Sequence, residues 1–179
     1  MQGVNLDIQA AIGKMTVRQA MTQTNNINVV GTHLLTLALV PLLLESETPR
    51  LAFTSSEMGS LAGTEKTGGV LPNAAPAKGW PKTVDVLTYP GFPAYRGSKA
   101  ALDMIARDWA RVLKEDGVKV HIIDPGLTAT KFAGGTPERA TSMGAHHPSI
   151  PAKLMAEVIE GQHDDHQGVL LSLVGVRGW

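Results

Sequence analysis

Two side chains of one predicted helix have the types and the spacing needed for proton transfer. Tyr95 and Lys99 are four residues apart, so a helix places the phenol and the ammonium side by side on one face. A neighbouring cation lowers the pKa of a phenol from its ordinary value of about 10 toward a range useful for acid/base catalysis. A serine hydroxyl from a neighbouring strand end, Ser55 or Ser56, could hold a carbonyl oxygen while the tyrosine gives or takes its proton.

Alternating strands and helices must position these side chains. Hydrophobic patterns predict strands over 50–55, 118–123 and 169–174, and helices over 17–23, 29–44, 95–116 and 152–160. This alternation is typical of parallel βαβ units, in which sites form at the carboxyl ends of the strands. We therefore expect an α/β fold: a truncated Rossmann-like, three-layer α/β/α arrangement with a short, mainly parallel sheet. A single domain over 1–179 accounts for the length.

A Gly/Pro-rich stretch separates the first predicted strand from the helix that carries Tyr95. Residues 57–94 hold six glycines and five prolines. A connection of this length inside a compact domain is usually functional or disordered. We expect an insertion that leaves the core of the fold and acts as a lid, with the segment 127–150 as a second cover of the pocket.

The composition of the chain excludes several kinds of chemistry and partner. The 179 residues include no cysteine, which excludes disulfides, a thiol nucleophile and cysteine-ligated zinc. Sixteen basic and sixteen acidic side chains give no general attraction to nucleic acid or anionic membrane. The apolar run 27–44 approaches the length of a membrane span. It contains Asn28 and Pro41 and lacks a basic flank, so we expect a helix buried in a soluble core, and a cytoplasmic protein without a signal peptide.

Three histidines could bind a metal ion or serve the packing of the fold. His163 and His166 flank two carboxylates in a pattern that is similar to a metal site. Because these residues lie between a predicted helix and a predicted strand, a solvated turn explains them better, and no metal is expected. His33, within the apolar helix, is expected to be a hydrogen-bonded core histidine.

The order of the motifs resembles the short-chain dehydrogenase/reductase family over residues 28–130. The resemblance rests on Asn28-Val29-Val30-Gly31, Arg50-Leu51-Ala52-Phe53-Thr54-Ser55-Ser56, Tyr95-x-x-x-Lys99 and Asp124-Pro125-Gly126-x-x-x-Thr130. In that family a tyrosine is the general acid/base and a serine positions the substrate oxygen. A lysine lowers the tyrosine pKa and binds the nicotinamide ribose, and an asparagine anchors a water of the proton relay.

The resemblance implies a role for each matching residue. The catalytic residues are Tyr95, Lys99, Ser56 and Asn28. The residues that would contact the nicotinamide end of a cofactor are Lys99, Pro125, Gly126 and Thr130. The family's two long helices commonly form a four-helix dimer interface, which implies a homodimer through helices 29–45 and 95–116.

The resemblance covers only the C-terminal half of the family. The absent half begins with a strand, a Gly-rich turn and a helix that binds the pyrophosphate of a dinucleotide. No Gly-x-x-x-Gly-x-Gly occurs in this sequence. A strand of that half pairs beside residues 50–55 in the full fold. Here that edge must be covered by the N-terminal segment, the insertion or another subunit.

Much of the binding energy of a dinucleotide comes from the half that is absent. We therefore expect acid/base chemistry at a carbonyl or hydroxyl carbon of a small organic substrate without a nucleotide cofactor, as in an isomerase, cyclase or dehydratase. One alternative is an NAD(P)(H)-dependent carbonyl reductase or alcohol dehydrogenase that is truncated or completed by a partner chain. A second alternative is an inactive dimerising or regulatory module.

Overall fold

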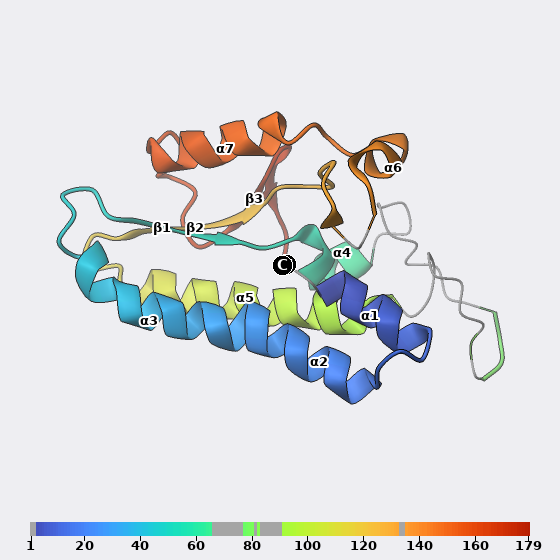
Figure 1. Ribbon diagram of the computed structural model, residues 1–179. Coiled ribbons are helices and arrows are strands. Elements are labelled where there is room, and N and C mark those ends of the chain that lie inside the picture. The colour runs from blue at the N-terminus through green and yellow to red at the C-terminus, as the bar shows by residue number, and fades with distance from the viewer. Residues whose placement is uncertain (1–2, 66–76, 81, 83–90, 133–134) are drawn as a thin grey trace.

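One mixed sheet, with helices on both faces, organises the fold (Figure 1). The computed structural model describes residues 3–65, 77–80, 82, 91–132 and 135–179. The strands, in sheet order, are β1 (Arg50–Thr54), β2 (Lys119–Asp124), β3 (Leu170–Ser172) and β4 (Gly175–Arg177). Strands β1, β2 and β3 are parallel, and β4 is antiparallel to β3. The expected truncated Rossmann-like fold with a short, mainly parallel sheet is confirmed.

Helices cover the sheet as the outer two layers. In chain order they are α1 (Gly3–Ala11), α2 (Val17–Asn25), the π-helix η1 (Asn26–Gly31), α3 (Thr32–Leu43), the 3₁₀ turn η2 (Glu57–Gly59), α4 (Leu61–Thr64), α5 (Pro93–Val112), α6 (Pro137–Ser142) and α7 (Ser149–Ile159). The run α2–η1–α3 and the helix α5 lie on one face of the sheet, and α7 lies on the other (Figure 1). This places the helix that carries Tyr95 directly against the strands.

The core lies on both sides of β2. This strand is buried on both faces, and the successive side chains of a strand point to opposite faces of the sheet. Ile122 packs into a cluster with residues of α5, including Leu102 and Ala106. Ile123 packs into a second cluster with residues of α7, including Val158. This alternation holds α5 and α7 against the same short sheet.

Some local elements match the sequence prediction and others do not. The helix α2 begins at residue 17 as predicted, capped by Thr16: the Thr16 hydroxyl accepts from the Gln19 N–H at 3.2 Å, and the Gln19 side chain accepts from the Thr16 N–H at 2.8 Å. The helices α1 and α6 were not predicted. Residues 169–174 were predicted as one strand, whereas the chain turns at Leu173 and Val174 and continues into β4.

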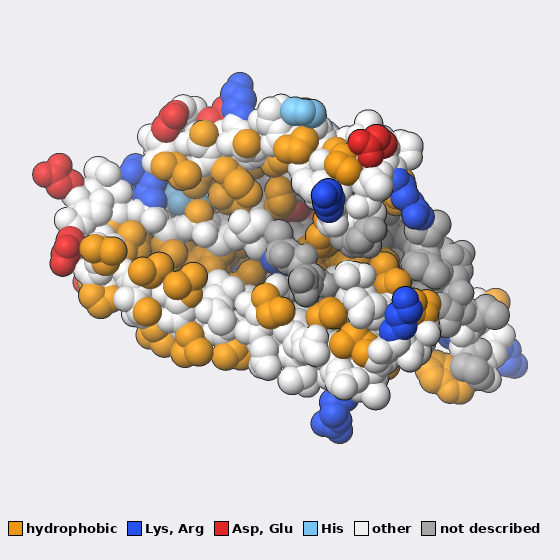
Figure 2. All heavy atoms as spheres, viewed as in Figure 1, with side chains coloured by type: hydrophobic (Ala, Val, Ile, Leu, Met, Phe, Trp, Pro, Cys, Tyr) orange, Lys and Arg blue, Asp and Glu red, His pale blue; other side chains and the backbone are white. Residues whose placement is uncertain are grey.

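The long apolar helix is not buried, so that expectation is wrong. The leucines of α3 are largely exposed, for example Leu34 at 58% and Leu42 at 64%, and Figure 2 shows apolar side chains gathered over this helix. The run Val17–Leu43 is long and apolar enough to cross a membrane by length and composition alone, and 11% of its most apolar window is buried. His33 does have the expected hydrogen bond, because the Trp109 indole N–H donates to His33 Nδ1 at 3.2 Å.

One edge of β1 has no pairing strand among the described residues. A groove of about 590 Å³ runs between this edge and the helices, lined by Thr36, Leu39, Phe53 and Lys99 among others. The described part of the insertion forms η2 and α4 and does not pair with the edge. Its remaining residues at 66–76, 81 and 83–90 lie outside the described residues, and with them most of the predicted lid.

Candidate active site

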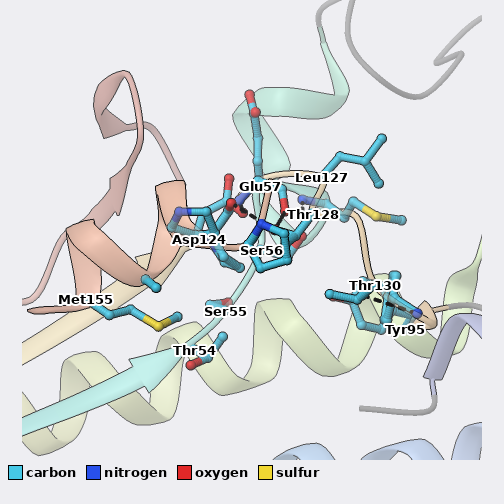
Figure 3. Close-up of a pocket in the computed structure, with 17 residues that line it drawn as sticks. Thr54, Ser55, Ser56, Glu57, Tyr95, Asp124, Leu127, Thr128, Thr130 and Met155 are labelled. Atoms are coloured by element: carbon cyan, nitrogen blue, oxygen red, sulfur yellow. Dashed lines mark hydrogen bonds between the residues drawn. The ribbon is translucent and has the colours of Figure 1, made fainter. Parts of the chain in front are cut away.

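A cavity of about 370 Å³ opens at the carboxyl ends of β1 and β2, where the strand order predicts a site (Figure 3). Of the residues singled out from the sequence, its lining contains Ser55, Ser56, Tyr95, Pro125, Gly126 and Thr130. They come from the end of β1, from the loop after β2 and from the first turn of α5. The remaining walls are mostly apolar, with Met58, Leu127, Phe132 and Met155.

The Tyr95 phenol is a buried proton donor in this cavity. Burial raises its pKa to about 12, and the Asp124 and Asp103 carboxylates add to that rise. The Ser56 hydroxyl lies close enough to lower the Tyr95 pKa by a smaller amount. The expected lowering of the Tyr95 pKa by a cation is therefore not observed, because burial and the two anions raise this pKa. At neutral pH the phenol keeps its proton and can donate it.

Lys99 lies beside Tyr95, but its ammonium faces the groove rather than the cavity. Its Nζ lies 5.8 Å from the centroid of the Tyr95 ring and donates to the carbonyl oxygen of Thr54 at 2.7 Å. Burial lowers the Lys99 pKa to about 8, while the Asp103 and Asp124 carboxylates oppose this shift. Lys99 as a residue is 2% exposed, and its ammonium stays protonated at neutral pH at the end of β1.

Asn28 reaches α5 from the π-helix η1. A π-turn widens the helix locally, and such turns are frequent at functional sites. The Asn28 side-chain amide donates to the Ser98 hydroxyl at 3.0 Å, and that hydroxyl donates to the backbone carbonyl of Tyr95 at 2.8 Å. Asn28 also lines the groove next to Lys99. The structure therefore connects Asn28 to Tyr95 through the backbone of α5.

The loop after β2 forms another wall of the cavity. The Asp124 carboxylate accepts from the Gly126 N–H at 3.0 Å. Gly126 has φ +67°, a backbone conformation that residues other than glycine rarely adopt. Farther along the loop, a β-bridge between Thr128 and His146 holds the segment in place. The loop therefore presents Gly126 and Thr130 to the cavity in a fixed arrangement.

Two buried carboxylates that support the site were missed from the sequence. Asp103 follows Lys99 by one helical turn on the same face of α5, so helical spacing could have indicated it. Neither of its oxygens makes a hydrogen bond of ordinary geometry to a described residue, although the nearby Ser55 hydroxyl favours its ionised form. Burial raises its pKa to about 6. Asp7 contacts α5 from 87 residues away in the sequence, so no local pattern could have revealed it.

The histidine-rich turn makes one ion pair and one further polar contact. Asp164 binds Arg50 at 2.7 Å, and His163 lies 3.5 Å from Glu157. Among the described residues, no three His, Asp or Glu side chains form a cluster that could hold a metal ion. Through the Asp164–Arg50 ion pair, the turn holds the loop before β3 against the start of β1.

Known proteins similar to this chain include dehydrogenases and reductases. A family model described as enoyl-(acyl carrier protein) reductase matches residues 83–161. The short-chain dehydrogenase/reductase eupG of Phoma sp is 42% identical over 170 residues, and tropE of Talaromyces stipitatus is 33% identical over 171 residues. These alignments cover 91% and 93% of this chain but 59% and 61% of the two relatives.

Solved structures show the same likeness in the fold. The NADPH-bound carbonyl reductase from chicken fatty liver matches with a TM-score of 0.66 at 20% identity, over 92% of this chain and 59% of that one. The carbonyl reductase Sniffer of D. melanogaster also matches with a TM-score of 0.66 at 20% identity, over 93% and 60%. The chain thus spans about three fifths of the length of these four proteins.

Proposed function

The chain corresponds to the C-terminal, catalytic portion of the short-chain dehydrogenase/reductase family, and we propose that it supplies the proton-transfer half of an NAD(P)(H)-dependent carbonyl reductase or alcohol dehydrogenase. The observation that carries the proposal is the protonated Tyr95 phenol beside the Ser56 hydroxyl in one cavity. Such a pair can bind a carbonyl oxygen and protonate it. The similar proteins named above are dehydrogenases and reductases, which supports reduction as the reaction.

The residues of the site divide the work of the reduction. Ser56 donates a hydrogen bond that orients the substrate oxygen toward Tyr95. Tyr95 transfers its proton to that oxygen while the carbonyl carbon accepts a hydride. The Lys99 ammonium stabilises the phenolate that remains, because it lies 5.8 Å from the ring in a buried environment. Oxidation of an alcohol follows the same steps in reverse.

The residues present fit one end of a nicotinamide cofactor, which supplies or accepts the hydride when bound. Gly126 and Thr130, which line the cavity, would contact the nicotinamide end, and Lys99, whose Nζ donates to Thr54 at the end of β1, would bind the ribose. This sequence has no Gly-rich turn for the pyrophosphate. We therefore place the adenosine and pyrophosphate contacts on a Gly-rich half supplied by another polypeptide segment, beside the open edge of β1.

The sequence alone favours acid/base chemistry without a nucleotide, as in an isomerase, cyclase or dehydratase. Tyr95 and Ser56 are also suited to that chemistry, but the named relatives give it no support. Proton transfer to a carbonyl oxygen is common to both reactions. The difference between them is whether a hydride accompanies the proton, and that is measurable.

A complementation experiment tests the proposal. The purified chain is mixed with the N-terminal half of the Phoma relative, and carbonyl reduction is followed by loss of NADPH or NADH absorbance. We expect reduction by the mixture that depends on Tyr95, and nucleotide binding by calorimetry that is stronger for the mixture than for the chain alone. Conversion of a carbonyl substrate by the chain alone without nucleotide consumption would support the cofactor-free reaction. A folded mixture that neither binds nucleotide nor reduces a carbonyl would overturn the proposal.

We further propose a homodimer through the helices at 29–45 and 95–116. The exposed leucines of α3 and Met104 of α5, which is 68% exposed, support this interface. Sedimentation of the purified chain tests it: a dimer is expected, and a monomer at micromolar concentration would contradict it.

A further inference from the structure

The helix that carries Tyr95 begins without a cap of its own. Phe92, at its N-cap, makes no side-chain hydrogen bond and has φ 54° and ψ 54°, the left-handed conformation. Among the described residues it is the only one other than glycine with a positive φ. The first N–H groups of any helix lack partners within the helix and need an acceptor from elsewhere.

Asp7 of α1 provides that acceptor. Its Oδ1 accepts from the Ala94 N–H at 3.0 Å, and its Oδ2 accepts from the Tyr95 N–H at 2.9 Å. The side chain is 3% exposed, so the two bonds form away from water, where charge-assisted hydrogen bonds are strong. A negative charge at a helix N-terminus also interacts favourably with the helix dipole. The carboxylate thus binds two successive N–H groups of α5 at once.

Both polar backbone groups of Tyr95, the N–H and the carbonyl, make hydrogen bonds with side chains. Its N–H donates to Asp7 of α1, and its carbonyl accepts from Ser98, which in turn accepts from Asn28 of η1. The ring also packs against Phe132, with 5.6 Å between centroids. Two of these restraints come from helices far away in the sequence, and α1 and α2 lie beside the start of α5 (Figure 1).

We propose that Asp7 is a positioning residue for the reaction at Tyr95: it fixes the first turn of α5, so that the phenol stays buried at the wall of the cavity. Loss of the carboxylate frees the Ala94 and Tyr95 N–H groups, and the turn shifts to find other partners. In its catalytic part this inference rests on the proposed function. A displacement of about 1 Å at a reacting group can cost a factor of about 100 in rate.

The burial of Asp7 is consistent with this role. Burial raises its pKa, whereas the hydrogen bonds from Tyr95 and Ala94 lower it. A buried carboxylate without partners would be strongly unfavourable. The two N–H groups therefore stabilise the buried Asp7 carboxylate, and the carboxylate in turn satisfies the two N–H groups. The interaction therefore couples α1 to the start of α5.

The experiment compares two caps. Asp7→Ala removes the cap of α5, and the matched control Thr16→Ala removes the capping box of α2, a helix that contributes no residue to the cavity. The first readout is the absorbance of tyrosinate in a Tyr89→Phe background, in which Tyr95 is the single tyrosine, since the chain has two. The second readout is kcat and KM for carbonyl reduction by the complemented protein.

We expect Asp7→Ala to lower the Tyr95 pKa from about 12 toward its ordinary value, because the phenol becomes exposed to water. We also expect kcat to fall by about ten- to a hundredfold with little change in KM. Thr16→Ala should change neither quantity. An Asp7→Ala protein that is folded and matches Thr16→Ala in both readouts would overturn the inference.

Asp7→Asn keeps the test decisive if Asp7→Ala does not fold. Its amide oxygen can still accept one N–H, so intermediate values of the Tyr95 pKa and of kcat are expected. Wild-type values in both readouts would overturn the inference. The absorbance titration needs no substrate and no nucleotide, so a failure of the proposed reductase activity leaves that half of the test intact.

Discussion

The carboxyl end of β1, on the cavity side, and the long edge of β1, its open flank, differ in how completely this chain satisfies them. On the cavity side, side chains from α1 and α5 bind the backbone of Tyr95, and Asn28 of η1, which also lines the groove, donates to one of them. On the open flank, the strand edge is unpaired among the described residues, a groove of about 590 Å³ lies open, and the leucines of α3 face solvent. The groups of the proposed proton transfer therefore lie together, whereas no described strand pairs with the edge beside which we propose the dinucleotide-binding half to lie.

Removing the phenol on the cavity side is expected to have the largest effect. Tyr95→Phe keeps the ring packed against Phe132 but removes the proton donor, so carbonyl reduction by the complemented protein should fall by about 10²- to 10⁴-fold. The measurement is kcat/KM, with nucleotide binding by calorimetry as the control. Unchanged binding with lost turnover is expected. Retention of near wild-type turnover would mean that another group donates the proton.

The buried charge next to Lys99 should make the stability of the protein depend on pH. The folded-state pKa of Asp103 is raised to about 6 from 3.8, so its contribution is fully present below pH 4 and is lost as the pH rises through 6. The loss amounts to at most about 3 kcal/mol of unfolding free energy. The wild type should therefore lose stability between pH 4 and pH 7, and Asp103→Asn should lose less. Urea unfolding at the two pH values measures both losses.

The control for this measurement lies on the same helix. Asp108 is exposed and pairs with Arg111 on the surface of α5. Asp108→Asn removes the same charge without removing a buried one, and it should leave the pH dependence as in the wild type. Equal pH profiles for Asp103→Asn and Asp108→Asn would contradict the assignment of the effect to Asp103.

Close packing on the cavity side gives a third prediction. A Cβ at Gly59 would lie 2.8 Å from Ala100 N and from the Lys99 Cβ, so η2 and α5 approach each other too closely for any other residue. Gly59→Ala should cost about 1–3 kcal/mol of unfolding free energy, the usual range for overpacking. Gly97→Ala, on α5 with open space around its Cβ, is the matched control. A cost at Gly59 no larger than that at Gly97 would contradict the close approach.

The open flank should tolerate a substitution that the cavity side would not. Leu34→Glu places a charge on the exposed face of α3, where the side chain is 58% exposed, so the monomer should change in stability by less than about 0.5 kcal/mol. The proposed dimer should dissociate, as measured by sedimentation. A dimer that survives would show that this face is not the interface. A large loss of monomer stability would mean that the leucines are packed.

The elements with strong local signals were predictable, and the weakly marked ones were not. A threonine suited to cap a helix precedes α2 at position 16, and the apolar pattern of β2 indicated a strand. The helix α6 and the strand β4 are short segments whose formation depends on neighbours rather than on periodicity. The burial of the long apolar helix was predicted wrongly, because periodicity shows which face is apolar but not whether anything covers it.

By itself the sequence determined that Tyr95 and Lys99 share a helical face and that Ser56 and Gly126 follow neighbouring parallel strands. These facts depend on helical spacing and strand order, which are local properties of the chain. Only the tertiary structure decided which groups these side chains meet. It turned the Lys99 ammonium toward Thr54, brought Asp7 to the start of α5, and raised the Tyr95 pKa. Burial and contacts between distant segments arise from packing, and no spacing along the chain specifies them.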